Sequence, residues 1–180
     1  MLNLHIKRKQ VDNLVDNSLA LNESRAPYSP TLWWLHDDST QKLRQVWFPG
    51  VHTSVGGGEK SYSISDITLV WMIQKILKHT KLECDTKYLV KGVEEGVFGE
   101  NDINIPWGCG NWVKPTGILN FLGGTKERTP GRYPKSGPKT QEYYHKSVQE
   151  RIKQGKYTGP DLSALTEEDS DDDLEQTLRW

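Results

Sequence analysis

A strand-like run, a glycine-rich loop and a strong helical repeat follow one another directly along this chain. Alternating apolar and polar side chains indicate a β-strand over Lys42–Phe48 (KLRQVWF). Apolar residues recur on one helical face after Ile67, so we expect a helix over residues 65–79. The intervening loop (PGVHTSVGGG) lies where ligands and catalytic groups collect in open α/β sheets. The predicted fold class is therefore α/β.

Three weaker patterns predict further elements. Helical spacing of Leu and Val predicts an amphipathic helix over residues 8–23. The short aromatic run TLWWL, residues 31–35, is typical of a buried strand. A last helix is expected over residues 140–154, and the Gly- and Pro-rich segments before it are expected to be loops.

The chain length allows one domain, which we place at residues 1–160 of the 180. A net charge of -1 points to no particular class of partner. Charge is nevertheless uneven, because seven of the nine residues from Glu167 to Glu175 are acidic. Like charges repel and remain solvated, so residues 161–180 are expected to form a disordered acidic tail.

The chain has the features of a soluble, cytoplasmic protein. Two cysteines in 180 residues do not make a disulfide framework. We see no signal peptide and no apolar run of transmembrane length. The basic segment 126–139 (KERTPGRYPKSGPK) lacks the signature of a nucleic-acid-binding fold, so no nucleic-acid partner is expected.

Several common chemistries are disfavoured by spacing. A phosphate-binding P-loop needs Gly followed directly by Lys, whereas Glu59 separates Gly58 from Lys60. The five histidines show no paired ligand spacing, so no metal and no other cofactor is predicted. Cys109 lies between glycines, but no histidine is placed by sequence to activate it as a nucleophile.

His52 is the strongest candidate for a catalytic residue. A lone histidine in a turn is more often structural than catalytic. This one, however, follows a predicted strand and lies in a glycine-rich loop, where an α/β-hydrolase carries its general base. Glycines in such a loop let the backbone approach the site without a side-chain clash.

Four segments together resemble one known family: SPTLWWL, QVWFPGVHTSVGGG, SDITLVWMI and RTPGRY. They are similar to the C-terminal half of the type VI secretion phospholipase-effector-like catalytic domain, and to its fungal members, over residues 17–160. The resemblance implies an α/β-hydrolase with a Ser-Asp-His triad that hydrolyses ester bonds, with phospholipids as the substrates of the bacterial effectors. By the same resemblance His52 is the triad histidine, and Gly56, Gly57 and Gly58 shape the site.

The chain also departs from the family pattern. Ser54 stands where the family usually has Asp or Asn, and Glu59 where an aromatic residue is common. No G-x-S-x-G nucleophile elbow occurs in the 180 residues. Ser54 lies two residues from His52 and on no such elbow, so it is a poor substitute nucleophile; we place it with the loop that shapes the site.

Two hypotheses follow for the function. In the first, the chain is the C-terminal portion of a serine-dependent ester hydrolase, with an incomplete sheet, and is inactive alone because its nucleophile lies in a missing N-terminal half. Its substrate would be a lipid or another ester. In the second, it is a non-catalytic interaction module built on a hydrolase-derived scaffold.

Overall fold

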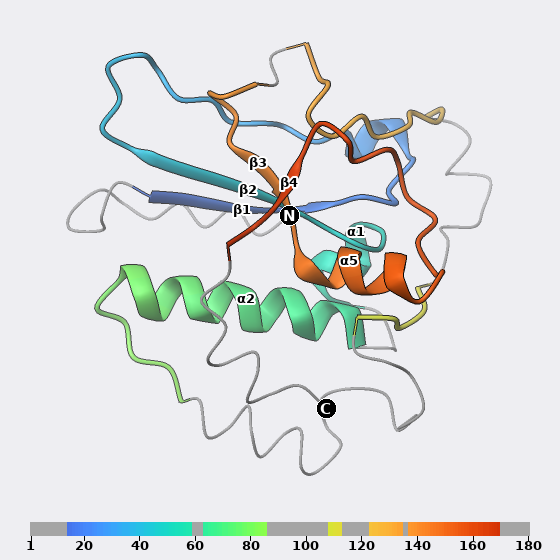
Figure 1. Ribbon diagram of the computed structural model, residues 1–180. Coiled ribbons are helices and arrows are strands. Elements are labelled where there is room, and N and C mark those ends of the chain that lie inside the picture. The colour runs from blue at the N-terminus through green and yellow to red at the C-terminus, as the bar shows by residue number, and fades with distance from the viewer. Residues whose placement is uncertain (1–13, 59–62, 86–107, 113–122, 135–136, 170–180) are drawn as a thin grey trace.

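The computed structural model describes residues 14–58, 63–85, 108–112, 123–134 and 137–169. Four parallel strands form one sheet in the order β1-β2-β3-β4. Their bounds are Leu14–Ala20, Lys42–Phe48, Glu142–Tyr144 and Thr166–Glu167. In Figure 1, helices α2 and α5 lie below the sheet, and the segment joining β1 to β2 runs above it. A parallel sheet with helices confirms the α/β class.

The strand and the long helix predicted from the sequence are present, but part of the loop expected between them, from His52 to Gly56, is a short helix. Strand β2 has the predicted bounds, and the following helices are α1 (His52–Gly56) and α2 (Ser63–His79). One core cluster packs between the sheet and these helices. It contains Val46, Phe48, Val55, Ile67 and Trp71, all buried.

The helix expected at residues 8–23 is wrong over its described part, because residues 14–20 form strand β1. Each residue of β1 pairs with one of β2, from Leu14↔Lys42 to Ala20↔Phe48. Side chains support this register: Asn17 Nδ2 donates to Gln45 Oε1 at 3.4 Å. Pairing with a neighbouring strand outweighs the helical spacing, which is a local preference. Residues 8–13 lie outside the described part of the chain.

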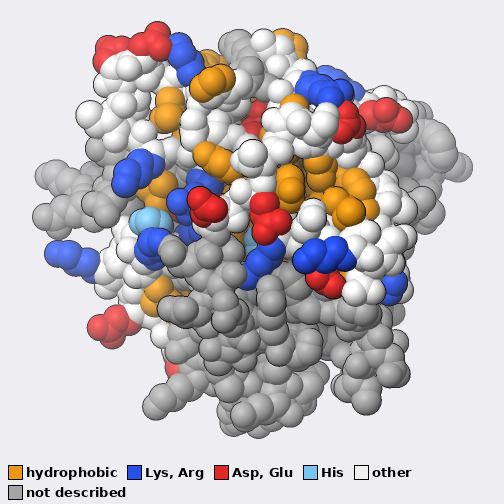
Figure 2. Space-filling view, viewed as in Figure 1, with side chains coloured by type: hydrophobic (Ala, Val, Ile, Leu, Met, Phe, Trp, Pro, Cys, Tyr) orange, Lys and Arg blue, Asp and Glu red, His pale blue; other side chains and the backbone are white. Residues whose placement is uncertain are grey.

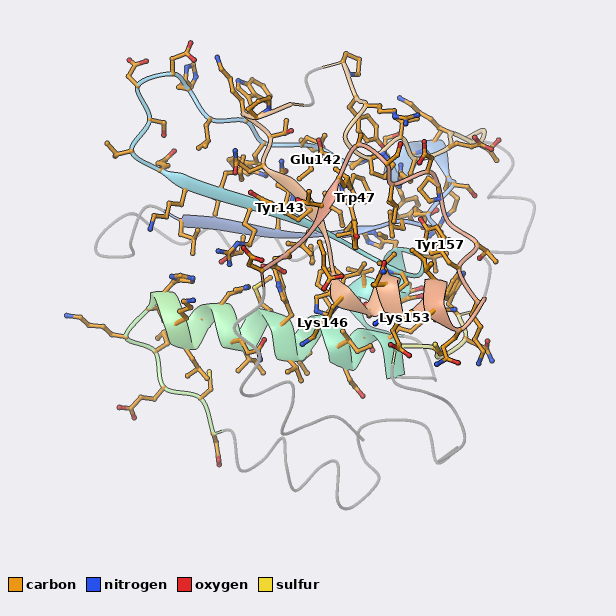
Figure 3. The ribbon with its side chains drawn as sticks, in the orientation of Figure 1. Trp47, Glu142, Tyr143, Lys146, Lys153 and Tyr157 are labelled. Carbon is orange, nitrogen blue, oxygen red and sulfur yellow. The ribbon has the colours of Figure 1, made fainter. Side chains whose placement is uncertain are left out.

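The opposite face of the sheet is covered by loops. A second core cluster contains Leu19, Leu21, Trp47 and, from the helix after β3, Val148. Trp47 Nε1 donates to Glu142 Oε2 at 3.1 Å (Figure 3). The run TLWWL crosses this face, but it is not the buried strand that we expected. Its backbone bonds to the side chain of Gln45 instead of a neighbouring strand, and Trp33 and Trp34 are exposed.

The helix predicted at 140–154 is shorter than expected, because its first part is strand β3. Helix α5 spans Lys146–Lys153 (Figure 3). His145 begins it as the N-cap, and its Nδ1 accepts from Ser147 N–H at 3.2 Å. A side chain that satisfies a free N–H at a helix start fixes where the helix begins.

Part of the acidic segment belongs to the sheet. Glu167 lies in β4, and Glu168 is buried although we expected this segment to be solvated. Glu168 Oε2 accepts from Trp71 Nε1 at 2.7 Å, and Lys75 Nζ lies 2.8 Å from Oε1. Buried charges are tolerated when they are paired in this way. Residues 170–180 lie outside the described residues.

Glu168→Gln tests whether this pair fastens β4 to α2. The change keeps the size of the side chain but leaves the buried Lys75 without its charged partner, so unfolding free energy should fall by about 3–5 kcal/mol. Urea denaturation measures the loss. Glu167→Gln, at an exposed position, is the control and should change stability by about 0.5 kcal/mol or less. Equal effects of the two changes would contradict the assignment.

Candidate functional site

The candidate site lies where β1 and β2 end. Because the strands are parallel, the segments that follow them meet at one edge of the sheet. Asn22 and Gly50 join these segments: Asn22 N–H donates to Gly50 O at 2.9 Å, and Gly50 N–H donates to Asn22 Oδ1 at 2.8 Å. Gly50 has φ of 105°, and a Cβ there would lie 2.6 Å from Ser54 Cβ. The turn therefore requires glycine.

His52 is the first residue of α1, just beyond the end of β2 (Figure 1). Its backbone N–H donates to Glu23 Oε2 at 3.3 Å. Glu23 is buried and forms an ion pair with Arg25, with 2.6 Å between Oε2 and Nη2. The carboxylate thus holds the start of α1 against the segment that follows β1.

Tyr28 covers the imidazole ring of His52. The two ring centroids are 5.0 Å apart, and the rings are inclined at 57°. The guanidinium of Arg25 lies over the Tyr28 ring, 4.0 Å from its centroid. Arg128 adds a second cation, because its Nη2 donates to the backbone oxygen of Tyr28. We call Glu23, Arg25, Tyr28, His52 and Arg128 the His52 cluster.

The surroundings favour a neutral imidazole. Burial lowers the pKa of His52, Glu23 opposes this effect, and the charges of Arg25 and Arg128 lower the pKa further. The pKa of Glu23 is itself lowered, because hydrogen bonds from Arg25 and from His52 N–H outweigh its burial. A neutral histidine can accept a proton from a hydroxyl group, which is the requirement for a general base.

No side chain of the described segments hydrogen-bonds the His52 ring. The bonds of Glu23 go to Arg25 and to the His52 backbone, so it does not orient the imidazole as a triad acid would. Ser54 is buried, and its Oγ accepts from Val51 N–H at 3.2 Å. This geometry gives Ser54 a part in holding the turn that carries His52.

The three loop glycines differ in their backbone demands. Gly57 and Gly58 have φ of 83° and 103°, in the region that favours glycine. Gly56 ends α1 without a positive φ, and a Cβ on it would meet nothing within 4 Å. Two of the three positions therefore require glycine for the path of the chain.

Sequence reasoning missed the partners of His52. Glu23 lies at the end of the helix expected over residues 8–23, Arg25 and Tyr28 lie just beyond it, and Arg128 lies in a segment taken for a solvated loop. It also missed His145, which follows β3 at the same edge of the sheet as His52. The His145 ring is fully buried and stacks on Phe48, with centroids 4.6 Å apart. The sequence signal that could have identified His145 is a histidine directly after a strand. It could be used only if residues 142–144 were predicted as a strand.

Other chemistries find little support in the described residues. Cys109 is buried, and burial raises the pKa of its thiol although Arg151 opposes this, so the reactive thiolate is disfavoured. The described part of the chain contains no group of three or more His, Cys, Asp or Glu side chains that could hold a metal ion. It also contains no helix with the length and apolar character to cross a membrane.

Comparison with known families gives one match. Residues 2–75 match the model described as T6SS, Phospholipase effector Tle1-like, catalytic domain. The family resemblance is thereby confirmed for this segment. The Tle1-like segment contains β1, β2, α1, His52 and the three loop glycines, whereas β3, α5 and β4 lie beyond the match. No curated protein and no solved structure matches the chain.

Alanine substitutions should separate the three glycines. Gly57→Ala and Gly58→Ala each impose a positive φ on a residue with a Cβ and should cost about 1–3 kcal/mol of unfolding free energy. Gly56→Ala is the matched control and should raise stability by about 0.4–1 kcal/mol, because alanine restricts the unfolded chain. Thermal unfolding measures all three. A loss at Gly56 as large as that at Gly57 would contradict this reading.

Proton NMR of the His52 ring should give a titration midpoint below the ordinary histidine pKa of about 6.5. Glu23→Gln should lower the midpoint further, because it removes the charge that favours the imidazolium. A lowered pKa means that the unfolded chain binds this proton more readily. His52 therefore stabilises the fold above about pH 6.5, and this contribution is lost as pH falls through the folded pKa. A midpoint above 6.5 would overturn the assignment.

Proposed function

We propose that this chain contributes the histidine of a serine-dependent ester hydrolase that acts on phospholipids or related esters. The main support is the family match, which covers His52 and its glycine loop. The match implies a lipase-like activity for the family. The half-buried ring, its lowered pKa and its place at the carboxyl end of a parallel strand add physical support.

In the proposed reaction His52 accepts the proton of the nucleophilic hydroxyl as that oxygen attacks the ester carbonyl carbon. The imidazolium then gives this proton to the leaving alcohol, and attack by water repeats the sequence to release the acid. The chain contains no G-x-S-x-G, and the Ser54 hydroxyl is buried in the turn. In this proposal the nucleophile is supplied by a polypeptide segment that bears G-x-S-x-G and is joined to this chain.

The proposal predicts that the 180-residue chain is silent in hydrolysis of phosphatidylcholine and p-nitrophenyl esters. When it is joined to a segment bearing G-x-S-x-G, encoded in the adjoining DNA, hydrolysis should appear. His52→Ala in that polypeptide should lower the rate by about 10²–10⁴-fold, the usual effect of losing a general base. Phospholipid turnover, followed by fatty-acid release, is the measurement.

His36→Ala is the matched control, because His36 is exposed in the loop before β2 and should leave the rate unchanged. His145→Ala separates the two histidines at the carboxyl edge. Loss of activity with His145→Ala but not with His52→Ala, both variants being folded, would overturn the role proposed for His52. Turnover by the 180-residue chain alone would overturn the predicted silence.

One observation favours the second candidate, a non-catalytic interaction module. Within the described residues no carboxylate orients the His52 ring, and Glu23 is paired with Arg25. If the adjoining DNA encodes no G-x-S-x-G and the chain is monomeric and folded by itself, this candidate is favoured. The two candidates thus differ in an observation that needs no substrate.

A further inference from the structure

Two adjacent tryptophans are exposed on the segment that joins β1 to β2. Trp33 and Trp34 are 55% and 49% exposed, and Tyr28 of the same segment is 41% exposed. Large aromatic side chains usually contribute to a core, so three in seven residues mark an unusual surface. We call residues 28–34 the aromatic segment.

The backbone of the aromatic segment is held in place. Gln45 is fully buried in β2, and its Oε1 accepts from Trp33 N–H at 2.9 Å. The Nε2 of the same amide donates to Trp33 O at 3.0 Å. Leu35 N–H donates to Lys139 O at 2.8 Å on the far side of the tryptophans. The sheet therefore presents Trp33 and Trp34 to solvent on a fixed backbone, which reduces the entropy lost on binding.

The aromatic segment also reaches the candidate site. Tyr28 at one end contacts the His52 ring, and Leu32 packs against the core cluster on that face of the sheet. A partner that bound to Trp33 and Trp34 would therefore contact the same short segment that covers His52.

The charges around the tryptophans are mixed. Lys139 Nζ and Asp37 Oδ1 form an ion pair at 2.5 Å beside this segment, and both residues are largely exposed. At the upper left of Figure 2 acidic, basic and hydrophobic side chains lie close together. A surface without one dominant sign is suited to a partner that is itself electrically neutral and carries both signs.

We propose that the aromatic segment is an interfacial binding surface for zwitterionic phospholipid, with Trp33 and Trp34 inserted among the headgroups. Tryptophan prefers this boundary, because its ring is apolar and its N–H finds polar partners there. The choice of a lipid over a protein partner rests on the proposed function, in which the substrate is a phospholipid or related ester. The same segment ends at Tyr28, which contacts the His52 ring.

Vesicle co-sedimentation tests the proposal with the full 180-residue chain. The wild type should sediment with phosphatidylcholine vesicles, and 0.5 M NaCl should leave binding nearly unchanged, because apolar insertion is not screened. The double variant Trp33→Ala/Trp34→Ala should lower partitioning by about tenfold or more. Leu82→Ala is the control at another exposed apolar position, 62% exposed, and should bind as the wild type does.

A second measurement does not depend on a variant that folds. Brominated phosphatidylcholine quenches the fluorescence of tryptophans within the bilayer, so vesicles made from it should quench the tryptophan fluorescence of the wild type. A circular dichroism melt shows whether the double variant is folded. No sedimentation, unchanged binding by the double variant, or binding to anionic vesicles alone that salt abolishes would each overturn the proposal. Self-association that the double variant loses, without vesicle binding, would assign the surface to a second copy of the chain.

This binding is distinguishable from catalysis. His52→Ala should sediment with phosphatidylcholine vesicles as the wild type does, because the imidazole is no part of the inserted surface. Binding without any hydrolysis in the joined polypeptide would overturn the proposed function and leave the lipid surface standing. Hydrolysis without the tryptophan-dependent binding would overturn the lipid surface and leave the proposed function standing.

Discussion

The parallel pairing of β1 with β2 is the constraint on which the rest of the described fold depends. Its register puts Ala20 opposite Phe48, so residues 22–28 and 50–52 leave the sheet side by side. The exchange of hydrogen bonds between Asn22 and Gly50 continues the pairing beyond the strands. The contacts of His52 with Glu23 and Tyr28 follow from this adjacency, since Glu23 and Tyr28 belong to one segment and His52 to the other.

Buried charge is the second organising feature. One group of ion pairs joins two strands, a helix and the segment after β4 through Asp16, Arg44, Lys75 and Glu168. Glu23 and Arg25 form a separate pair beside His52. Lys75, Glu168 and Glu23 are buried and need their charged partners, so both groups fix which segments can meet. In this lean, polar chain, paired charges do part of the work that apolar side chains do elsewhere.

The candidate site and the aromatic segment share one construction. A buried side chain holds each of them by the backbone: Glu23, just after β1, at His52, and Gln45, in β2, at Trp33. The functional side chains are then left partly exposed. This arrangement is typical of binding and catalytic residues, which lie on loops that a rigid scaffold positions. The proposed lipid surface and the proposed proton acceptor are linked through Tyr28, which ends the aromatic segment and contacts the His52 ring.

The sequence by itself determined the elements whose signal is local. Strand β2 and helix α2 follow from apolar periodicity and were predicted almost to the residue, whereas helix α1 within the expected glycine loop was not predicted. Placing His52 at the mouth of this unit needed nothing more. The family resemblance likewise depends on short contiguous motifs, and the match over residues 2–75 confirms it for the three motifs in that segment.

Only the tertiary structure decided the elements whose partners are distant in the chain. Residues 14–20 have helical spacing, yet they form a strand because β2 supplies the hydrogen bonds. The run TLWWL has strand composition, yet a side-chain amide takes its backbone bonds. Glu168 was predicted to be solvated, yet it is buried against Trp71 and Lys75, which lie more than 90 residues earlier in the chain. The physical reason is common to all three: hydrogen-bond and charge partners separated along the chain leave no periodic trace in the sequence.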